Sequence, residues 1–339
     1  MKRTRISALL ALTAGSLVIG AALAAAPERQ GSPRILVFTK TTSFRHASIP
    51  VGVRAVRELG ERNGLVVDAT EDSGAFTPSN LARYDAVVFL LTTGDVLNGP
   101  QQAAFERFLR ADGGFVGIHS AADTEYGWAW YGGLLGTSFR SHPHIQRGVI
   151  DVADQRHPST AGLPRRWARI DEWYNFAQNP RPSVRVLATL DETSYLPGEG
   201  AMGADHPIAW SHEYQGGRAW FTGGGHTDES YSEPLFRKHL LGGIRYAAGL
   251  TPPRIVSVTS AVQTRRLLAR VRYLSCHPCV GQLEVLVRGR RSRTRIRLSG
   301  GQGRARSARL PLGRWRFSVA LKDPKTGLEH AVRRSVRVG

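Results

Sequence analysis

The chain has 339 residues, of which 41% are hydrophobic and only two are cysteines. This composition excludes a disordered chain and a small domain held together by disulfides, and the length allows two domains with substantial cores. The formal net charge of +19 is unevenly distributed: residues 251–339 hold 21 Lys and Arg against 3 Asp and Glu, whereas residues 6–250 hold 22 against 24. The C-terminal part is therefore either the binding surface for an anionic partner or a solvated basic surface.

Residues 1–26 have the pattern of a secretory signal peptide. Three basic residues precede an apolar run over residues 8–23, and Ala22-Leu23-Ala24 places small residues where a signal peptidase cleaves. A membrane anchor is the alternative, but the apolar run is shorter than the ~20 residues that a spanning helix needs. We therefore expect a secreted, periplasmic or cell-surface protein that is not membrane-spanning when mature.

Residues 33–249 are predicted to form an α/β domain. Apolar runs such as residues 34–39 and 85–91 are typical of buried strands. Helical patterns lie between the strands, and one of them begins where Ser48, a capping residue type, precedes Pro50. Strands that alternate with helices predict a mostly parallel sheet with helices on both faces.

The second half of this domain carries strand patterns without long helices between them, and we expect these strands to be antiparallel. They cover residues 149–152, 169–174, 184–190, 208–213 and 218–222. Gly216-Gly217 fits a tight hairpin between the last two strands. An amphipathic helix over residues 233–248 is expected to close the domain, and Pro252-Pro253 marks a linker.

Residues 254–339 are predicted to form a small, basic, Ig-like β-sandwich. Four segments alternate apolar residues with arginine or small residues, and glycine-rich turns separate them. These segments are residues 267–273, 283–287, 294–298 and 315–321. Cys276 and Cys279 lie among them, and we expect a small structural disulfide there in preference to a redox motif or a zinc site.

Polar residues that could carry chemistry follow the predicted strands. In parallel α/β sheets, ligands bind at the carboxyl ends of the strands. His46 follows the first strand, and His119 follows the fourth in a turn of small residues, where enzymes with a nucleophile elbow carry Ser or Cys. A neutral imidazole suits metal binding or general base catalysis better than covalent attack. Ser120 is a weaker candidate nucleophile because its neighbours do not form G-x-S-x-G.

A series of motifs resembles the ThuA-like (trehalose-utilisation) family. In chain order they are FTKTTSFRH, ATEDSGAFT, DAVVFLLTTGDVLN, GGFVGIHSAADTEY, SHP, HPST, DEWYNF, DHPIAW and TGGGHT, and they span residues 35–248. The resemblance implies a flavodoxin-like fold similar to class I glutamine amidotransferases. His119 stands where those enzymes carry cysteine, which argues against a glutaminase. The resemblance also implies a link to trehalose and related disaccharides or keto-sugars, and a bound metal.

The matched motifs contain a candidate metal site. We predict that a divalent ion, with Zn²⁺ the best fit, is held by His119, His142, Glu172 and His226, with an open position for substrate. The alternative is that each histidine is a hydrogen-bonded structural residue, since no local zinc signature is present. A nucleotide cofactor is not expected, because the chain has neither G-x-G-x-x-G at its first helix nor a Walker motif.

Catalytic roles are predicted for His119, Glu172 and Asp123, of which the two carboxylates could act as acid and base on a glycosidic bond. Substrate contacts are predicted where aromatic rings can stack on sugars and polar groups can take hydroxyls. The residues concerned are His46, Tyr126, Trp128, Tyr174 and His206. Core packing is the alternative role for the aromatic residues after His119.

Two functional hypotheses remain open at this point. In the first, the protein is a carbohydrate-directed hydrolase or isomerase that acts on trehalose-like or keto-disaccharides. In the second, it is a non-catalytic protein that binds a saccharide or the cell wall. The expected partners are a small carbohydrate and, for the basic C-terminal domain, an anionic cell-wall polymer; nucleic acid is not expected.

Overall fold

The computed structural model describes residues 32–251, 254–274, 280–287, 290–299, 302–322 and 329–338. The predicted signal peptide, 1–26, and the predicted disulfide between Cys276 and Cys279 lie outside these residues. Within the part described, no helix has the length and apolar character needed to span a membrane. Most strands of residues 34–222 form one large sheet, and the strands of residues 254–338 form another.

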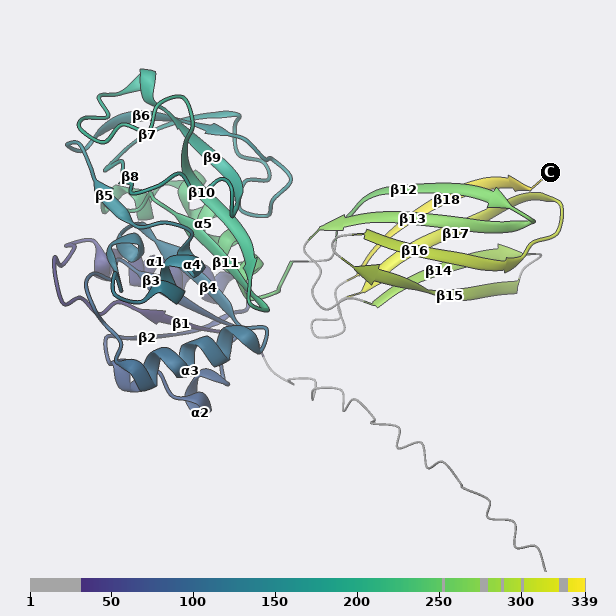
Figure 1. Cartoon of the computed structure of the whole chain (residues 1–339), viewed down its shortest axis with the longest axis horizontal. Coiled ribbons are helices and arrows are strands. Elements are labelled where there is room, and N and C mark those ends of the chain that lie inside the picture. The colour runs from purple at the N-terminus through teal and green to yellow at the C-terminus, as the bar shows by residue number, and fades with distance from the viewer. Residues whose placement is uncertain are drawn as a thin grey trace, which may run out of the picture. The chain divides into compact units, whose positions relative to one another are not determined.

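The first part is an α/β fold built on a nine-stranded sheet with the strand order β2-β1-β3-β4-β11-β10-β9-β6-β7 (Figure 1). Its elements are, in chain order, β1 (Arg34–Phe38), α1 (Ile49–Arg62), β2 (Val66–Thr70), α2 (Pro78–Leu81), β3 (Ala86–Leu90), α3 (Gly99–Arg110), β4 (Gly114–Ile118), α4 (Ala129–Leu135), β5 (Phe139–Ser141), β6 (Gln146–Val152), β7 (Arg166–Asp171), β8 (Asn175–Phe176), β9 (Arg185–Asp191), β10 (His206–Tyr214), β11 (Gly217–Thr222) and α5 (Pro234–Ala247). Strands β5 and β8 pair separately.

Helices cover both faces of the parallel half of the sheet, as the alternation of helices and strands predicted. Successive residues of the buried strand β3 face opposite layers. Phe89 stacks on Phe105 of α3, with ring centroids 5.4 Å apart. On the other face, Leu90 lies beside Gly52 of α1, where a Cβ added to the glycine would be 3.1 Å from the leucine side chain. The mostly parallel sheet expected from the sequence is therefore confirmed for this half.

Strand β11 departs from the expected arrangement. We predicted it to be one of the antiparallel strands, and its hairpin with β10 is indeed antiparallel. On its other side, however, β11 pairs in parallel with β4, with Thr222 opposite Ile118. The parallel set therefore has five strands, and the end of β11 lies next to the end of β4. This placement brings the loop after β11 to the predicted ligand-binding edge of the sheet.

The antiparallel half of the sheet curls back toward this edge. Strand β7 is the last strand in the sheet order, yet its Trp167 and Arg169 side chains both donate hydrogen bonds to Glu233, at the start of α5. Arg169 also donates to Ser230 in the loop between β11 and α5. The residues that follow β7 are thereby brought close to the ends of β4 and β11.

The start of α1 also differs in detail from the expectation. The helix begins at Ile49 with Pro50 in its first turn, as predicted, but the Ser48 side chain does not cap it. The Ser48 hydroxyl instead donates to the backbone carbonyl of His226 at 2.6 Å. This serine therefore ties the loop after β1 to the loop after β11.

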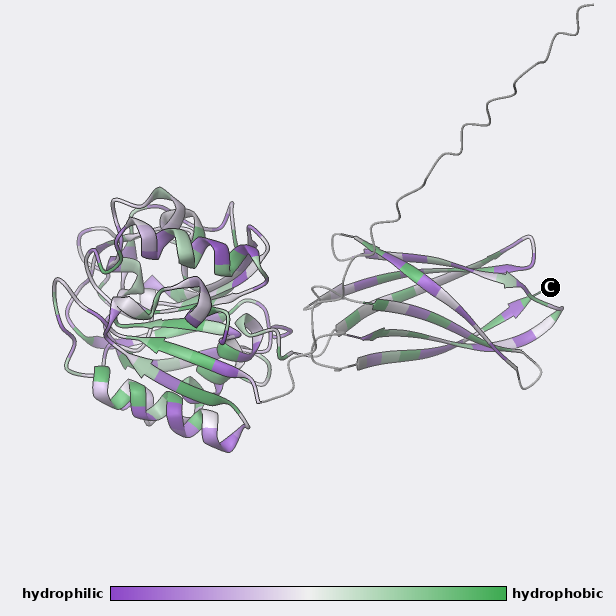
Figure 2. Ribbon diagram, turned by 90° about the horizontal axis from the view of Figure 1, so that it is seen from below, coloured by the Kyte–Doolittle hydropathy of each residue, from purple (hydrophilic) through white to green (hydrophobic). Residues whose placement is uncertain are grey.

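The second part is an antiparallel all-β unit, as predicted. Its strands are β12 (Arg254–Gln263), β13 (Arg266–Leu274), β14 (Val280–Val287), β15 (Arg290–Ser299), β16 (Gln302–Arg309), β17 (Gly313–Lys322) and β18 (Glu329–Val338), in the order β12-β13-β16-β15-β14-β17-β18. Hydrophobic and hydrophilic residues alternate along these strands (Figure 2). Side chains such as Leu267, Leu283 and Val319 fill the core, while arginines alternate with them on the outer faces.

Candidate functional site

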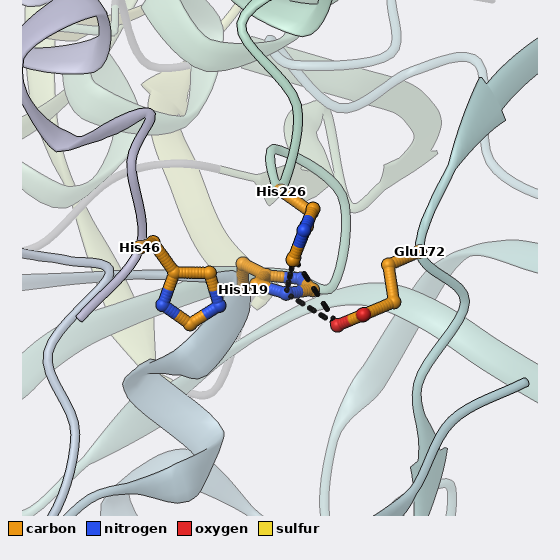
Figure 3. A group of neighbouring side chains, drawn as sticks. All are labelled: His46, His119, Glu172 and His226. Carbon is orange, nitrogen blue, oxygen red and sulfur yellow. Dashed lines mark hydrogen bonds and ion pairs between the residues drawn. The ribbon is translucent and has the colours of Figure 1, made fainter. Parts of the chain in front are cut away.

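The candidate site lies at the carboxyl ends of the parallel strands. His46 follows β1, His119 follows β4 and His226 follows β11, while Glu172 comes directly after β7. One ligand atom from each of these four side chains lies within 4.8 Å of those of the other three. Figure 3 shows the four side chains converging from four separate segments of the chain.

His119 lies in the turn after β4, as the small residues there predicted, and this turn fixes its orientation. It is fully buried and has a φ of 51°, a left-handed conformation that is uncommon for a residue with a side chain. The ring atom Nδ1 lies 2.8 Å from the carbonyl oxygen of Gly223. A carbonyl only accepts hydrogen bonds, so Nδ1 carries a proton and donates to Gly223, while Nε2 faces the site. A backbone partner of this kind commonly orients a metal-binding histidine.

Glu172 is the central acceptor of the group. Its Oε2 lies 3.3 Å from Nε2 of His119 and 3.2 Å from Nδ1 of His226, and its Oε1 lies 3.1 Å from Nδ1 of His142. Burial alone would raise the pKa of this carboxyl, but hydrogen bonds and charge from His119 and His226 lower it far below its ordinary value. Glu172 is therefore a carboxylate at neutral pH.

His226 responds to the same carboxylate. Its Nδ1 also lies 3.2 Å from Nε2 of His119. Burial lowers the pKa of His226, but the hydrogen bond and negative charge of Glu172 outweigh that effect, and the pKa is raised above its ordinary value. The histidines and the carboxylate thus form a coupled group in which a proton or a cation balances the charge of Glu172.

His46 completes the group from the other side. Its ring centroid lies 5.2 Å from that of His119 and 5.0 Å from that of His226. Its Nδ1 lies 3.4 Å from the Ser120 hydroxyl. Burial, followed by the neighbouring charges of His119 and His226, lowers the pKa of His46 to about 3. His46 is therefore neutral at physiological pH, which is the form in which an imidazole binds a metal.

A buried ion pair holds two members of the group in place. Asp171 is fully buried and pairs with Arg169 at 3.0 Å. Its Oδ1 accepts the backbone N–H groups of Glu172 and His226, each at 3.0 Å, and its Oδ2 accepts that of Gly225 at 2.8 Å. One carboxylate thus fixes the backbone at both Glu172 and His226. Sequence reasoning missed this role, although Asp171 lies within the matched motif DEWYNF.

The structure groups the predicted metal ligands differently from the sequence. His119, Glu172 and His226 come together, and His46, predicted as a substrate contact, joins them. His142 touches Glu172 from outside the group, and 43% of its side chain is exposed. His142 therefore lies at the margin of the site.

Two of the predicted sugar-contacting residues and one predicted acid lie beside the group. The Tyr174 ring packs on His119, with centroids 4.0 Å apart. Tyr126 is exposed and donates to Asp123 at 2.7 Å. Burial, the largest influence, raises the pKa of Asp123, while the Tyr126 hydrogen bond and the charge of His119 oppose it. Asp123 is thus a carboxyl group that holds a proton more readily than an exposed one.

The other two residues predicted to contact the sugar, Trp128 and His206, form interactions within the protein instead. Trp128 stacks on Trp130, with centroids 5.0 Å apart, and its indole donates to Glu106 of α3. His206 is fully buried, and its ring nitrogens lie 2.8 Å from the Tyr174 carbonyl and 2.8 Å from Glu192. The His206 ring therefore supports the segment that carries Tyr174.

The four grouped residues fit a divalent transition metal. Imidazole nitrogens and a carboxylate oxygen are the donors that Zn²⁺ and similar ions take, and the group offers three imidazoles and one carboxylate. The Gly223 carbonyl and the Asp171 carboxylate supply the outer hydrogen bonds that such sites need. These residues could therefore hold one ion, with Tyr174 and Asp123 beside it.

Fold and site together define an α/β protein that gathers ionisable side chains at the carboxyl ends of a parallel sheet. The model of the ThuA family, described as trehalose utilisation, matches residues 34–247. The chain therefore belongs to the ThuA family. A comparison with curated proteins gives no match.

Two solved structures of ThuA-like proteins share the fold. One, described as a putative ThuA-like protein from Bacteroides uniformis ATCC 8492, is 23% identical with a TM-score of 0.55, covering 66% of this chain and 94% of its own. The other, described as a putative ThuA-like protein from Parabacteroides merdae ATCC 43184, is 20% identical with a TM-score of 0.54, covering 64% of this chain and 90% of its own. At these identities the likeness shows the fold.

Proposed function

We propose that this protein is a metal-dependent enzyme that acts on a small carbohydrate, a trehalose-like disaccharide or its keto derivative, outside the cytoplasm. One observation carries the proposal: His46, His119, Glu172 and His226 bring their ligand atoms within 4.8 Å of one another at the ligand-binding edge of the sheet. Membership of the trehalose-utilisation family supports the choice of substrate class.

A divalent ion bound there would polarise a carbonyl or hydroxyl oxygen of the sugar. The chain's own residues supply the remaining functions. The Tyr174 ring, packed on His119, presents an aromatic face beside the site. Asp123, with its raised pKa and the Tyr126 hydroxyl 2.7 Å away, is placed to take up or deliver a proton. Both keto-sugar isomerisation and glycosidic hydrolysis need these functions.

Asp123 and Glu172 are therefore given different roles. The low pKa of Glu172 and its contacts with two histidines suit a metal ligand, whereas the raised pKa of Asp123 suits an acid or base. We expect Asp123→Asn to keep the metal but lose turnover by about 10²- to 10⁴-fold, the usual contribution of a general acid or base. We expect Glu172→Gln to lose both the bound metal and turnover.

The experiment is a turnover assay with trehalose, sucrose and their 3-keto derivatives, followed by chromatography of the products, on metal-loaded wild type and both variants. Turnover that Asp123→Asn abolishes without loss of metal supports the proposal. Turnover that is equal in Glu172→Gln and wild type contradicts it.

A non-catalytic saccharide-binding protein is the second candidate. It is favoured by the all-β part, whose outer faces carry arginines. Saccharide binding that is unchanged in His119→Ala and Glu172→Ala, without turnover of any substrate in metal-loaded wild type, would favour this candidate over the enzyme.

A further inference from the structure

Strand β15 changes its pairing partner along its length. Residues 290–296 pair with β14, whereas residues 297–299 pair with β16. Strand β16 continues alongside β13 as far as Arg309. Beyond the cross-strand pair formed by Arg297 and Arg304, β15 and β16 therefore separate, and a groove opens between them.

The groove is large and strongly basic. Its volume is about 940 Å³, near the upper end of the ~300–1,000 Å³ typical of ligand sites. Four of its lining residues are arginines, and none is acidic or aromatic. The arginines are Arg295 and Arg297 on β15 and Arg304 and Arg306 on β16.

These four positive charges have no carboxylate partner within the residues that the structure describes. Arg306 contacts the Thr264 hydroxyl at 3.3 Å. In contrast, Arg291 and Arg293, in the part of β15 that pairs with β14, lie 3.7 and 3.0 Å from Glu284. Like charges this close repel one another, so an anion in the groove would relieve their repulsion.

The spacing of the charges suits an extended chain of anions. Outward residues two apart on one strand are separated by about 6.6 Å, and directly opposite residues on paired strands by about 5 Å. Arg295 and Arg297 thus form one row, Arg304 and Arg306 form a second, and Arg297 faces Arg304 across the pair. Two rows of guanidinium groups can take successive anions along a polymer.

The lining favours a glycan over other polyanions. Planar guanidinium groups form paired hydrogen bonds with carboxylates and phosphates. In the described pairings, β15 over residues 290–296 and β16 over residues 305–309 each have a strand partner on one side only. Their unpaired backbone N–H and C=O groups face the groove, where they can form hydrogen bonds with sugar hydroxyls. The groove has no aromatic side chain on which nucleic-acid bases could stack.

We propose that the groove between β15 and β16 binds an anionic polysaccharide. The choice of a glycan rests on the carbohydrate-directed function proposed above, whereas the anionic character rests on the four arginines. The groove would hold the protein on an acidic polymer independently of the histidine site in the α/β part.

The test is binding of the full chain to polygalacturonate and to phosphorylated dextran, measured by titration calorimetry at increasing salt. Methyl-esterified polygalacturonate is the uncharged probe. The test variant is Arg297→Gln/Arg304→Gln, which removes the central cross-strand pair. The matched control is Arg314→Gln/Arg337→Gln, an exposed cross-strand pair on β17 and β18 with the same loss of charge.

We expect wild type to bind at least one charged polysaccharide and not the neutral ester, with binding that weakens as salt rises. The test variant should bind at least about tenfold more weakly, because it loses charge-assisted hydrogen bonds from two arginines. The control should retain wild-type affinity. All variants should show the circular dichroism of wild type, since the substituted side chains lie outside the core.

Three results would overturn the proposal: no binding to either charged polysaccharide, equal weakening in the test and control variants, or tighter binding to an oligo-dT strand or polyglutamate than to the glycans. The proposal can fail separately from the enzymatic one. His119→Ala should leave polysaccharide binding intact, and the test variant should leave turnover of small soluble sugars intact.

Discussion

Replacing Asp171 with asparagine should destabilise the α/β part and loosen the candidate metal site. The Asp171 carboxylate is fully buried, pairs with Arg169 at 3.0 Å and accepts three backbone N–H groups. Asparagine keeps the shape but removes the charge and replaces one acceptor oxygen with a donor. Arg169, which is also buried, would be left with Glu233 as its remaining charged partner among those described.

The expected loss of unfolding free energy is about 3–5 kcal/mol, the usual result of removing one member of a buried ion pair. The new amide NH2 group would face N–H donors, either that of Gly225 or those of Glu172 and His226, and would weaken the shared anchor of these two loops. Loss of such an outer contact lowers metal affinity by about 10- to 100-fold. The substitution should therefore change stability and metal binding together.

Urea unfolding followed by tryptophan fluorescence measures the first effect, because six of the seven tryptophans lie in residues 128–220. Asp151→Asn is the matched control. Asp151 pairs with Arg166 at 3.1 Å, but its side chain is 41% exposed, so we expect a loss of about 1 kcal/mol or less. A loss in Asp171→Asn no larger than in Asp151→Asn would refute the reasoning.

Three further predictions concern packing, pH and proton transfer. Gly243→Ala should lower the free energy of unfolding by about 1–3 kcal/mol, because the added Cβ would lie 2.3 Å from the Trp220 ring. Gly132→Ala, which has open space around the added Cβ, should leave thermal and urea unfolding unchanged. Burial is the largest influence that lowers the pKa of His46 and His157 to about 3 and that of His239 to about 4 in the folded chain. Between pH 6.5 and 4 the unfolded chain therefore binds more protons at these histidines than the folded chain does. The unfolding free energy should therefore fall as pH falls through this window, by up to about 1.4 kcal/mol per pH unit for each histidine; a flat profile would contradict this. Tyr126→Phe should lower turnover while metal content stays unchanged, because it removes the hydroxyl that donates to Asp123; loss of metal in this variant would argue against the role given to Asp123.

The buried parallel strands could be predicted from the sequence because both of their faces are covered. Residues 86–90 are all apolar, and a short run of this kind is typical of a strand that has no solvent-facing side. The position of β11 between β4 and β10 could not be predicted, because pairing between residues about a hundred positions apart leaves no local signal. Strand β16 was missed for a different reason. Its inward positions are Gly303, Ala305 and Ser307, too small to produce apolar alternation.

The candidate site was predicted in part. Turns of small residues after apolar strands pointed to His119 and His226, and the structure places both in the group. Sequence position alone does not give the direction of a side chain. It could not show that His46 turns into the group while His142 lies at its margin, or that Ser48 contacts the His226 loop instead of capping a helix.

The central claim is that His46, His119, Glu172 and His226 hold a divalent ion. Elemental mass spectrometry of the untagged protein, purified without chelator and then offered Zn²⁺, Mn²⁺, Fe²⁺ and Ni²⁺, tests it directly. We predict stoichiometric binding of one of these metals in wild type and in Asp123→Asn, and its loss in Glu172→Gln. Wild type that binds none of these metals, or Glu172→Gln that binds as much as wild type, would contradict the account.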